Sequence, residues 1–283
     1  MFLPASFPRG VPPAREVCEY AALAEDLGFD ALWAGDHLLW RAPMLEPLTT
    51  LGYLATATSQ IHLGINVYLA GLRPPVLSAR MLGSLWWLSE GRLELGVGVG
   101  GDHEPDFEAV GVSIRHRGKL LDEALSSIRR WWTGDDPGRR VSPSPERSCP
   151  LWIGGRSEAA LRRVVAQQAD GFTAHLVTVE QLGKAAARLR EMCEEAGRPM
   201  ARVAVTVMVD VHGRGGGDGE EFLRAHFGEN SARLARFLVS GSEDECAERL
   251  REYLQIADHL ILLPATFAPE AALPKLRRIV EVA

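Results

Sequence analysis

Short apolar runs alternate with longer amphipathic stretches along the whole chain. The runs Ile61–Val67 and Val203–Val211 are almost continuously apolar, as expected for parallel strands that are covered on both faces. The stretch Arg115–Trp132 instead places its apolar residues at helical spacing, on one face. This alternation predicts parallel strands joined by helical crossovers.

About eight strand–helix units follow one another without an obvious linker, which predicts a single TIM-type (β/α)₈ barrel over residues 1–283. An open doubly wound sheet is the alternative. The first strand is a stub, which suggests a mis-assigned start or an open seam in the barrel. The expected strands are Phe2–Pro4, Ala31–Ala34, Ile61–Val67, Arg92–Val97, Leu151–Ile153, Gly171–His175, Val203–Val211 and His259–Leu263. The expected helices are Pro13–Leu27, Glu46–Thr58, Pro74–Leu88, Arg115–Trp132, Glu158–Gln168, Val179–Ala196 and Pro269–Val282. Two more helical segments are expected after the glycine-rich stretch Gly213–Gly219, and the second of them is Glu243–Ile256.

Composition narrows the class of protein. The net charge of −6 argues against a nucleic-acid partner, which usually meets a basic face. No apolar run approaches the roughly 18 residues that cross a bilayer, and the first residues lack a secretory signal, so we expect a cytoplasmic protein without a membrane partner. The four cysteines are scattered and no metal-binding spacing occurs, so we expect reduced thiols and no metal.

Polar residues follow the second strand at the end where a barrel carries its functional groups. Asp36 and His37 place a carboxylate beside an imidazole, which supplies a hydrogen-bond acceptor and a group that titrates near neutrality. Both are therefore candidate catalytic residues. The alternative is an aspartate that caps the next turn and a histidine that is simply packed.

Two glycine-rich strand ends indicate ligand contacts. Gly96–Gly101 matches G-x-G-x-x-G formally, but no helix opens there directly, so we interpret it as close approach of a planar ligand. Gly154-Gly155-Arg156-Ser157 opens a helix and predicts an anion pocket, unless Ser157 is a plain N-cap. Asn66 interrupts an apolar strand, which indicates a bulge, a ligand contact or a satisfied inward amide.

Taken together, these segments resemble the bacterial luciferase-like monooxygenase superfamily, in its branch that uses the deazaflavin coenzyme F420. The resemblance runs in family order over most of the chain. It is carried by residues 24–37 (AEDLGFDALWAGDH), 91–100 (GRLELGVGVG), 150–157 (PLWIGGRS), 169–172 (ADGF) and 241–244 (GSED).

The resemblance implies a (β/α)₈ barrel and hydride transfer at the deazaflavin C5. It implies that Asp36 and His37 line the cofactor ring, with His37 as proton donor or acceptor. A non-prolyl cis peptide behind the ring is expected at Asn66-Val67. The resemblance assigns Gly98, Val99 and Gly100 to the ring border, and Gly154, Gly155, Arg156 and Ser157 to the side-chain phosphate.

Departures from the family leave the substrate open. Gly101 stands where sugar-phosphate dehydrogenases of this branch carry a glutamate, so a sugar phosphate is not expected, and the variable loop Thr133–Pro150 is short. We expect an F420-dependent oxidoreductase acting on a small organic molecule. An FMN-dependent monooxygenase that uses O₂ is the alternative, and a non-catalytic cofactor-binding protein is a third.

Trp86-Trp87 and Trp131-Trp132 fall on expected helices and suggest core packing or a homodimer interface.

Overall fold

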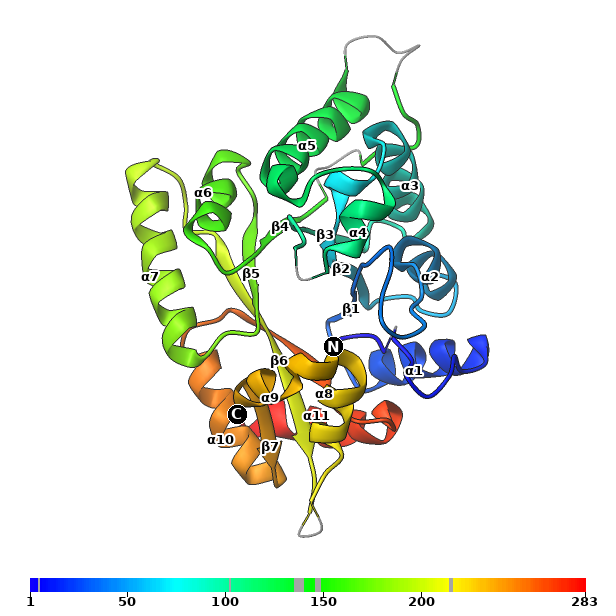
Figure 1. Ribbon diagram of the computed structural model, residues 1–283, viewed down its shortest axis with the longest axis vertical. Coiled ribbons are helices and arrows are strands. Elements are labelled where there is room, and N and C mark those ends of the chain that lie inside the picture. Colours follow the sequence, from blue (N-terminus) through cyan, green and yellow to red (C-terminus); the bar gives the residue numbers. More distant parts are fainter. Residues whose placement is uncertain (5, 102, 135–139, 146–148, 214–215) are drawn as a thin grey trace.

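A computed structural model describes residues 1–283 except 5, 102, 135–139, 146–148 and 214–215. Parallel strands form one curled sheet in the order β1-β2-β3-β4-β5-β6-β7, and β8 pairs with the other edge of β6 (Figure 1). This is the α/β barrel architecture that the sequence predicts. The strands are β1 (Ala31–Ala34), β2 (His62–Tyr68), β3 (Leu93–Val97), β4 (Leu151–Gly154), β5 (Gly171–His175), β6 (Arg202–Val211), β7 (Leu238–Gly241) and β8 (His259–Pro264).

The first residues of the chain close the sheet between β8 and β1. Phe2 N donates to Leu262 O at 2.7 Å, while Leu3 N donates to Trp33 O at 2.8 Å. Trp33 N in turn donates to Met1 O at 2.8 Å. The expected stub of a first strand is therefore present. The suggested open seam was wrong, because these backbone hydrogen bonds join the first and last strands.

Strand β7 is an addition that the hydrophobic pattern did not predict. It pairs with the last residues of β6, from Met208 to Val211, beyond the part of β6 that pairs with β5. It has only four residues and an exposed Ser240, so it lacks the long apolar run of the other strands. Asp210 ties this extension together, because its buried carboxylate accepts hydrogen bonds from Gly219 N and Ser240 Oγ.

Helices lie along the outside of the sheet, with α6 beside α7 and α3 beside α5 (Figure 1). Local sequence fixes several of their starts: Pro75 opens α3, and Ser242 with Glu245 forms a capping box at α10. The helices are α1 (Ala14–Asp26), α2 (Pro47–Leu54), α3 (Pro75–Leu88), α4 (Pro105–Ala109), α5 (Arg117–Thr133), α6 (Glu158–Ala166), α7 (Val179–Glu195), α8 (Gly219–Phe227), α9 (Ser231–Leu234), α10 (Glu243–Leu254) and α11 (Pro269–Val282).

Two tryptophans fill the barrel near the amino ends of its strands. The rings of Trp33 and Trp152 meet edge to face with centroids 6.2 Å apart, and both side chains are buried. Gly64 and Gly171 leave room for them, because a Cβ atom at either glycine would overlap an indole ring. Trp152 Nε1 donates to Glu94 Oε2 at 2.7 Å. This end of the barrel is therefore packed, which leaves the carboxyl ends of the strands for a ligand.

Candidate active site

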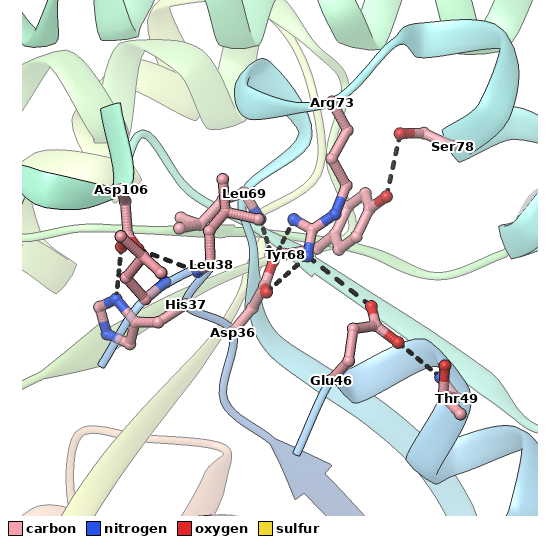
Figure 2. Close-up of polar contacts among 11 residues, drawn as sticks. Asp36, His37, Leu38, Glu46, Thr49, Tyr68, Leu69, Arg73, Ser78 and Asp106 are labelled. Carbon is pink, nitrogen blue, oxygen red and sulfur yellow. Dashed lines mark hydrogen bonds and ion pairs between the residues drawn. The ribbon is translucent and has the colours of Figure 1, made fainter. Parts of the chain in front are cut away.

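His37 lies just beyond β1, at the carboxyl rim of the barrel, and is held by a buried aspartate (Figure 2). Its Nδ1 is 2.7 Å from Asp106 Oδ2. The other oxygen, Asp106 Oδ1, accepts hydrogen bonds from Leu38 N at 2.9 Å and Leu39 N at 2.7 Å. The Asp106 side chain is 2% exposed, whereas that of His37 is 22% exposed. The pair thus has a buried anchor and an accessible ring.

The electrostatics of this pair determine which ring nitrogen of His37 carries the proton. Burial raises the pKa of Asp106, but the hydrogen bonds from His37 and Leu39 outweigh it and bring that pKa below its usual range. An ionised carboxylate accepts only, so the proton of the short contact belongs to His37 Nδ1. Nε2 has no hydrogen-bond partner among the described residues. The geometry therefore leaves Nε2 for proton exchange with a ligand.

Asp36, which was expected to line the ring beside His37, occupies a different position. Its carboxylate has no exposed surface and is bidentate with Arg73, at 2.6 and 2.8 Å (Figure 2). Oδ2 also accepts a hydrogen bond from Leu69 N at 2.8 Å. Although burial lowers the pKa of Arg73, Asp36 raises it above its usual value. Asp36 therefore anchors the chain after β2, and its expected contact with a cofactor ring stays a prediction.

The expected cis peptide is present between Asn66 and Val67, where the pairing of β2 with β3 shifts register. Asn66 Nδ2 donates to Thr206 Oγ1 at 2.9 Å, so the amide has a partner within the barrel and the bulge is present, while a contact with a ligand stays a prediction. Leu69, two residues after the cis bond, is the residue whose N–H is fixed by Asp36. The bulge is thus held from both sides, by β6 and by the segment after β1.

Glycines around the bulge make room for protein atoms. A Cβ atom at Gly98 or Gly154 would overlap the side chain of Val67, which lies between the ends of β3 and β4. Gly100 has φ +65°, a backbone conformation that favours glycine, and packs near Leu69. The structure explains these small residues by packing against Val67 and Leu69. The prediction that Gly98, Val99 and Gly100 also border a ring remains open.

The segment that was expected to bind a phosphate lines a basic cavity of about 510 Å³ between α6, α7 and the α9 region. Ser157 is the N-cap residue of α6, but its side chain makes no capping hydrogen bond. Gly155 N donates to Thr173 O at 3.1 Å, so that donor is already used. The cavity's cationic residues are Arg156, Lys184, Arg188, Arg233 and Arg236, and Glu158 lines it as well. Lys184 and Arg188 are paired with glutamates of α6 and α7, so only part of this positive charge is available to a ligand.

An aromatic cluster lies beside His37. The ring of Trp40 stacks on His37 with centroids 4.2 Å apart. The ring of His103 lies 5.4 Å from that of Trp40, edge-on. Phe227, at the end of α8, approaches Trp40 from the other side with a centroid distance of 6.3 Å. These contacts give the His37 site a largely apolar surround.

Some residues of the site had no signal in the sequence. Asp106 is 69 positions from His37 and follows the glycine-rich end of β3 in a short helix. Arg73 and Trp40 were likewise not singled out.

The expected substrate loop Thr133–Pro150 includes residues 135–139 and 146–148, which lie outside the described residues. Among the described residues, no group of three or more His, Cys, Asp or Glu side chains is placed to hold a metal, and no helix is long and apolar enough to cross a membrane.

The chain belongs to the luciferase-like monooxygenase family, whose sequence model matches residues 1–226. An uncharacterized protein of Mycobacterium tuberculosis is 33% identical over 166 residues, which cover 55% of this chain and 57% of the relative. The match thus spans little more than half the length of that relative. A phthiodiolone/phenolphthiodiolone dimycocerosates ketoreductase of Mycobacterium bovis is 27% identical over 76% of this chain and 66% of its own.

Solved structures with the same fold include enzymes of two cofactor classes. An F420-dependent secondary alcohol dehydrogenase in complex with an F420-acetone adduct superposes with a TM-score of 0.82, at 17% identity over 96% of this chain and 95% of its own. The oxygenating constituent of 3,6-diketocamphane monooxygenase from Pseudomonas putida, in complex with FMN, gives a TM-score of 0.72 at 16% identity. The match covers 100% of this chain and 95% of the monooxygenase chain. The family model and these structures establish the family and the fold, and they leave the cofactor of this chain undetermined.

Proposed function

We propose that this protein is an F420-dependent oxidoreductase that transfers a hydride between the deazaflavin and a small organic substrate. The observation that carries the proposal is the His37–Asp106 pair at the barrel rim, with Nδ1 fixed and Nε2 accessible. Hydride transfer to or from a carbon–oxygen bond needs a partner that gives or takes the accompanying proton. Family membership supplies the redox class.

The residues at the rim fit such a cofactor. The bulge at Asn66-Val67 would form the surface behind the ring, and Asp36 fixes the following residues through its hydrogen bond from Leu69 N. Arg156 and Ser157 line a cavity with an excess of positive charge, at the N-terminus of α6, where an anion is favoured. These groups would hold the side-chain phosphate. The bound deazaflavin would supply a carbon that donates or accepts the hydride.

The protein's own residues then manage the proton and the surroundings. With Nδ1–H donated to Asp106, His37 Nε2 accepts a proton from a substrate hydroxyl, and it returns that proton in the reverse direction. Asp106 holds the ring and compensates its positive charge while the proton is bound. Trp40 covers one face of the imidazole by stacking, and Phe227 packs against Trp40.

Titration of the purified protein with F420 and with FMN tests the cofactor, followed by turnover with a panel of alcohols and carbonyl compounds. We expect F420 to bind and FMN not to bind. The preference for F420 is supported by the resemblance around Asp36-His37 and by the F420-dependent enzyme among the structural neighbours. FMN binding with oxygen-dependent oxidation of a substrate would instead support the monooxygenase.

The His37→Ala variant separates catalysis from binding. Loss of the proton-transferring group should lower turnover by about 10²–10⁴-fold and leave F420 affinity almost unchanged. His116→Ala removes an exposed histidine elsewhere on the surface and is the matched control. Steady-state kinetics and a fluorescence titration give the two quantities. Equal turnover of His37→Ala and wild type would remove the role of His37.

The double variant Arg156→Ala/Ser157→Ala tests the phosphate side. It should weaken F420 binding by about 1–3 kcal/mol, the size of charge-assisted hydrogen bonds, because two donors to the anion are lost. Turnover at saturating F420 should change much less. Arg224→Ala, on α8 and away from the basic cavity, is the control. Unchanged F420 affinity in the double variant would place the phosphate elsewhere.

A further inference from the structure

A second cavity, of about 290 Å³, opens beside the strand that closes the barrel. It lies between the N-terminal segment, α8 and the turn from β8 into α11. Its wall is mostly aromatic and aliphatic. The apolar lining includes Phe2, Phe7, Met44, Phe222, Leu263 and Phe267.

The charged groups around this cavity are compensated or exposed. Arg9 pairs with Glu221 at 2.6 Å, and its guanidinium lies 3.6 Å from the centre of the Phe267 ring. His226 is buried, with Nδ1 2.9 Å from Phe222 O and Nε2 3.3 Å from Ser6 O, and burial lowers its pKa despite these contacts. Glu16 and Glu270 also line the cavity, but both are exposed to solvent, so the cavity holds no buried charge that would balance an ionic ligand.

One polar atom at the cavity has no partner. Ser6 Oγ is buried and makes no hydrogen bond to any of the described residues. Ser6 lines the cavity, and its backbone bridges to Met44. Because Oγ has almost no accessible surface, it would meet an uncharged ligand oxygen only through a change of the Ser6 rotamer, which would give this buried hydroxyl the partner it lacks.

The cavity lies close to the His37 site. It borders the end of the Met1–Leu3 strand, which is hydrogen-bonded to β1, and β1 leads into His37. Neighbouring strands are about 4.8 Å apart, so the two strand ends are within the span of a small organic molecule. A series of ring contacts links the two: Trp40 stacks on His37, Phe227 contacts Trp40, and Phe227 adjoins His226 of the cavity wall.

We infer that this cavity binds the apolar body of an uncharged substrate whose reactive carbon lies towards His37. An apolar cavity of about 150 Å³ holds one benzene ring, so a cavity twice that size holds about ten to twelve non-hydrogen atoms. The substrate class is then a neutral alcohol or ketone with a bicyclic or branched body. The binding site stands on the cavity alone, and only the reaction of its occupant rests on the proposed function.

Calorimetric titration of the cofactor-free protein with 2-tetralone tests the site, since this ketone has the expected size and no charge. We expect saturable binding, and at least tenfold weaker binding of 2-naphthoate, which has a similar body and a carboxylate. Ser6→Ala should weaken 2-tetralone binding by about threefold to tenfold, the loss of one hydrogen bond. Equal affinity for the two compounds would overturn the inference.

Filling the cavity provides the second arm of the test. Met44→Trp should reduce 2-tetralone binding at least tenfold, and Leu263→Phe is the second filling variant should Met44→Trp not fold. Leu254→Trp, at the exposed end of α10, should bind like wild type. Binding that persists in folded filling variants would exclude this cavity. If 2-tetralone binds as expected but F420 does not, the proposed function fails and the cavity assignment stands.

Discussion

His37 illustrates how one side chain is given a chemical role by a neighbour distant in sequence. Its ring nitrogen Nδ1 is bound to Asp106, whose second oxygen is occupied by two backbone N–H groups of the segment that carries His37 itself. The carboxylate thus positions the imidazole and the backbone beneath it together. Asp36, the direct neighbour of His37, does not take part, because Arg73 and Leu69 N occupy it.

Asp106→Asn should lower turnover by about 10²-fold or more, because an amide neither compensates the imidazolium nor fixes the Nδ1 proton. The effect should fall on kcat, with F420 affinity nearly unchanged. Steady-state kinetics over a range of pH should also show a changed pH profile, which a purely structural defect would not produce. Asp244→Asn, an exposed change in α10, is the control.

The same variant has a signature in stability. The pKa of Asp106 is lowered in the folded protein, so its ionised form stabilises the fold fully above the unfolded-state pKa of about 3.9. This contribution is lost as the pH falls through the lower, folded-state pKa. The difference in free energy of unfolding between wild type and Asp106→Asn should therefore be largest near neutrality and shrink in acid, as urea denaturation can show. A difference that grows in acid would contradict the assignment.

At the scale of elements, the bulge of β2 depends on glycines in the neighbouring strands. Val67 projects into space that Gly98 and Gly154 leave open, and Gly96 approaches the carbonyl of Ile65 closely. The glycines at the ends of β3 and β4 therefore shape the rim by packing. The sequence singled out the same glycines for ligand contacts, which stay a prediction, but it did not predict their packing against Val67 and Ile65, because a pattern does not show which atoms come close.

Gly98→Ala should destabilise the protein by about 1–3 kcal/mol, since the new methyl group would overlap Val67 in a packed region. The double variant Gly98→Ala/Val67→Ala should recover part of that loss. Gly52→Ala is the matched control: its Cβ would meet no atom within 4 Å in helix α2, so it should be neutral or stabilising. Thermal and urea unfolding measure all three. Equal stability of Gly98→Ala and Gly52→Ala would refute the packing argument.

At the scale of the whole molecule, helix α3 presents an apolar face to solvent. Leu77, Met81 and Leu88 recur at helical spacing and are exposed, and Trp87 is 63% exposed. Of the paired tryptophans, Trp132 donates from Nε1 to Ala79 O and so joins α5 to α3. The expected homodimer stays a prediction, and this face, continued by Tyr53 of α2, is its proposed interface because contiguous exposed apolar patches mark association sites.

Trp87→Glu should convert a dimer into a monomer without changing the fold, since a charge at the centre of an apolar interface is not compensated. Sedimentation velocity gives the oligomeric state, and circular dichroism checks the fold. Leu254→Glu introduces the same charge at an exposed leucine outside the α3 face. A wild-type monomer, or a Trp87→Glu protein that remains dimeric, would rule out this interface.

The resemblance predicted the position of the cis peptide at Asn66-Val67, and the local pattern predicted the rim segments and the order of strands and helices apart from β7 and α4. These features follow from local periodicity, turn chemistry and the placement of strand ends, which neighbouring residues encode. The single domain over residues 1–283 stays a prediction. Tertiary structure alone decided that Asp106 holds His37, that Asp36 is occupied by Arg73, that β7 extends the sheet and that Met1–Leu3 closes the barrel. Each is a contact between distant segments, and such contacts depend on which atoms the folded chain brings within hydrogen-bonding distance.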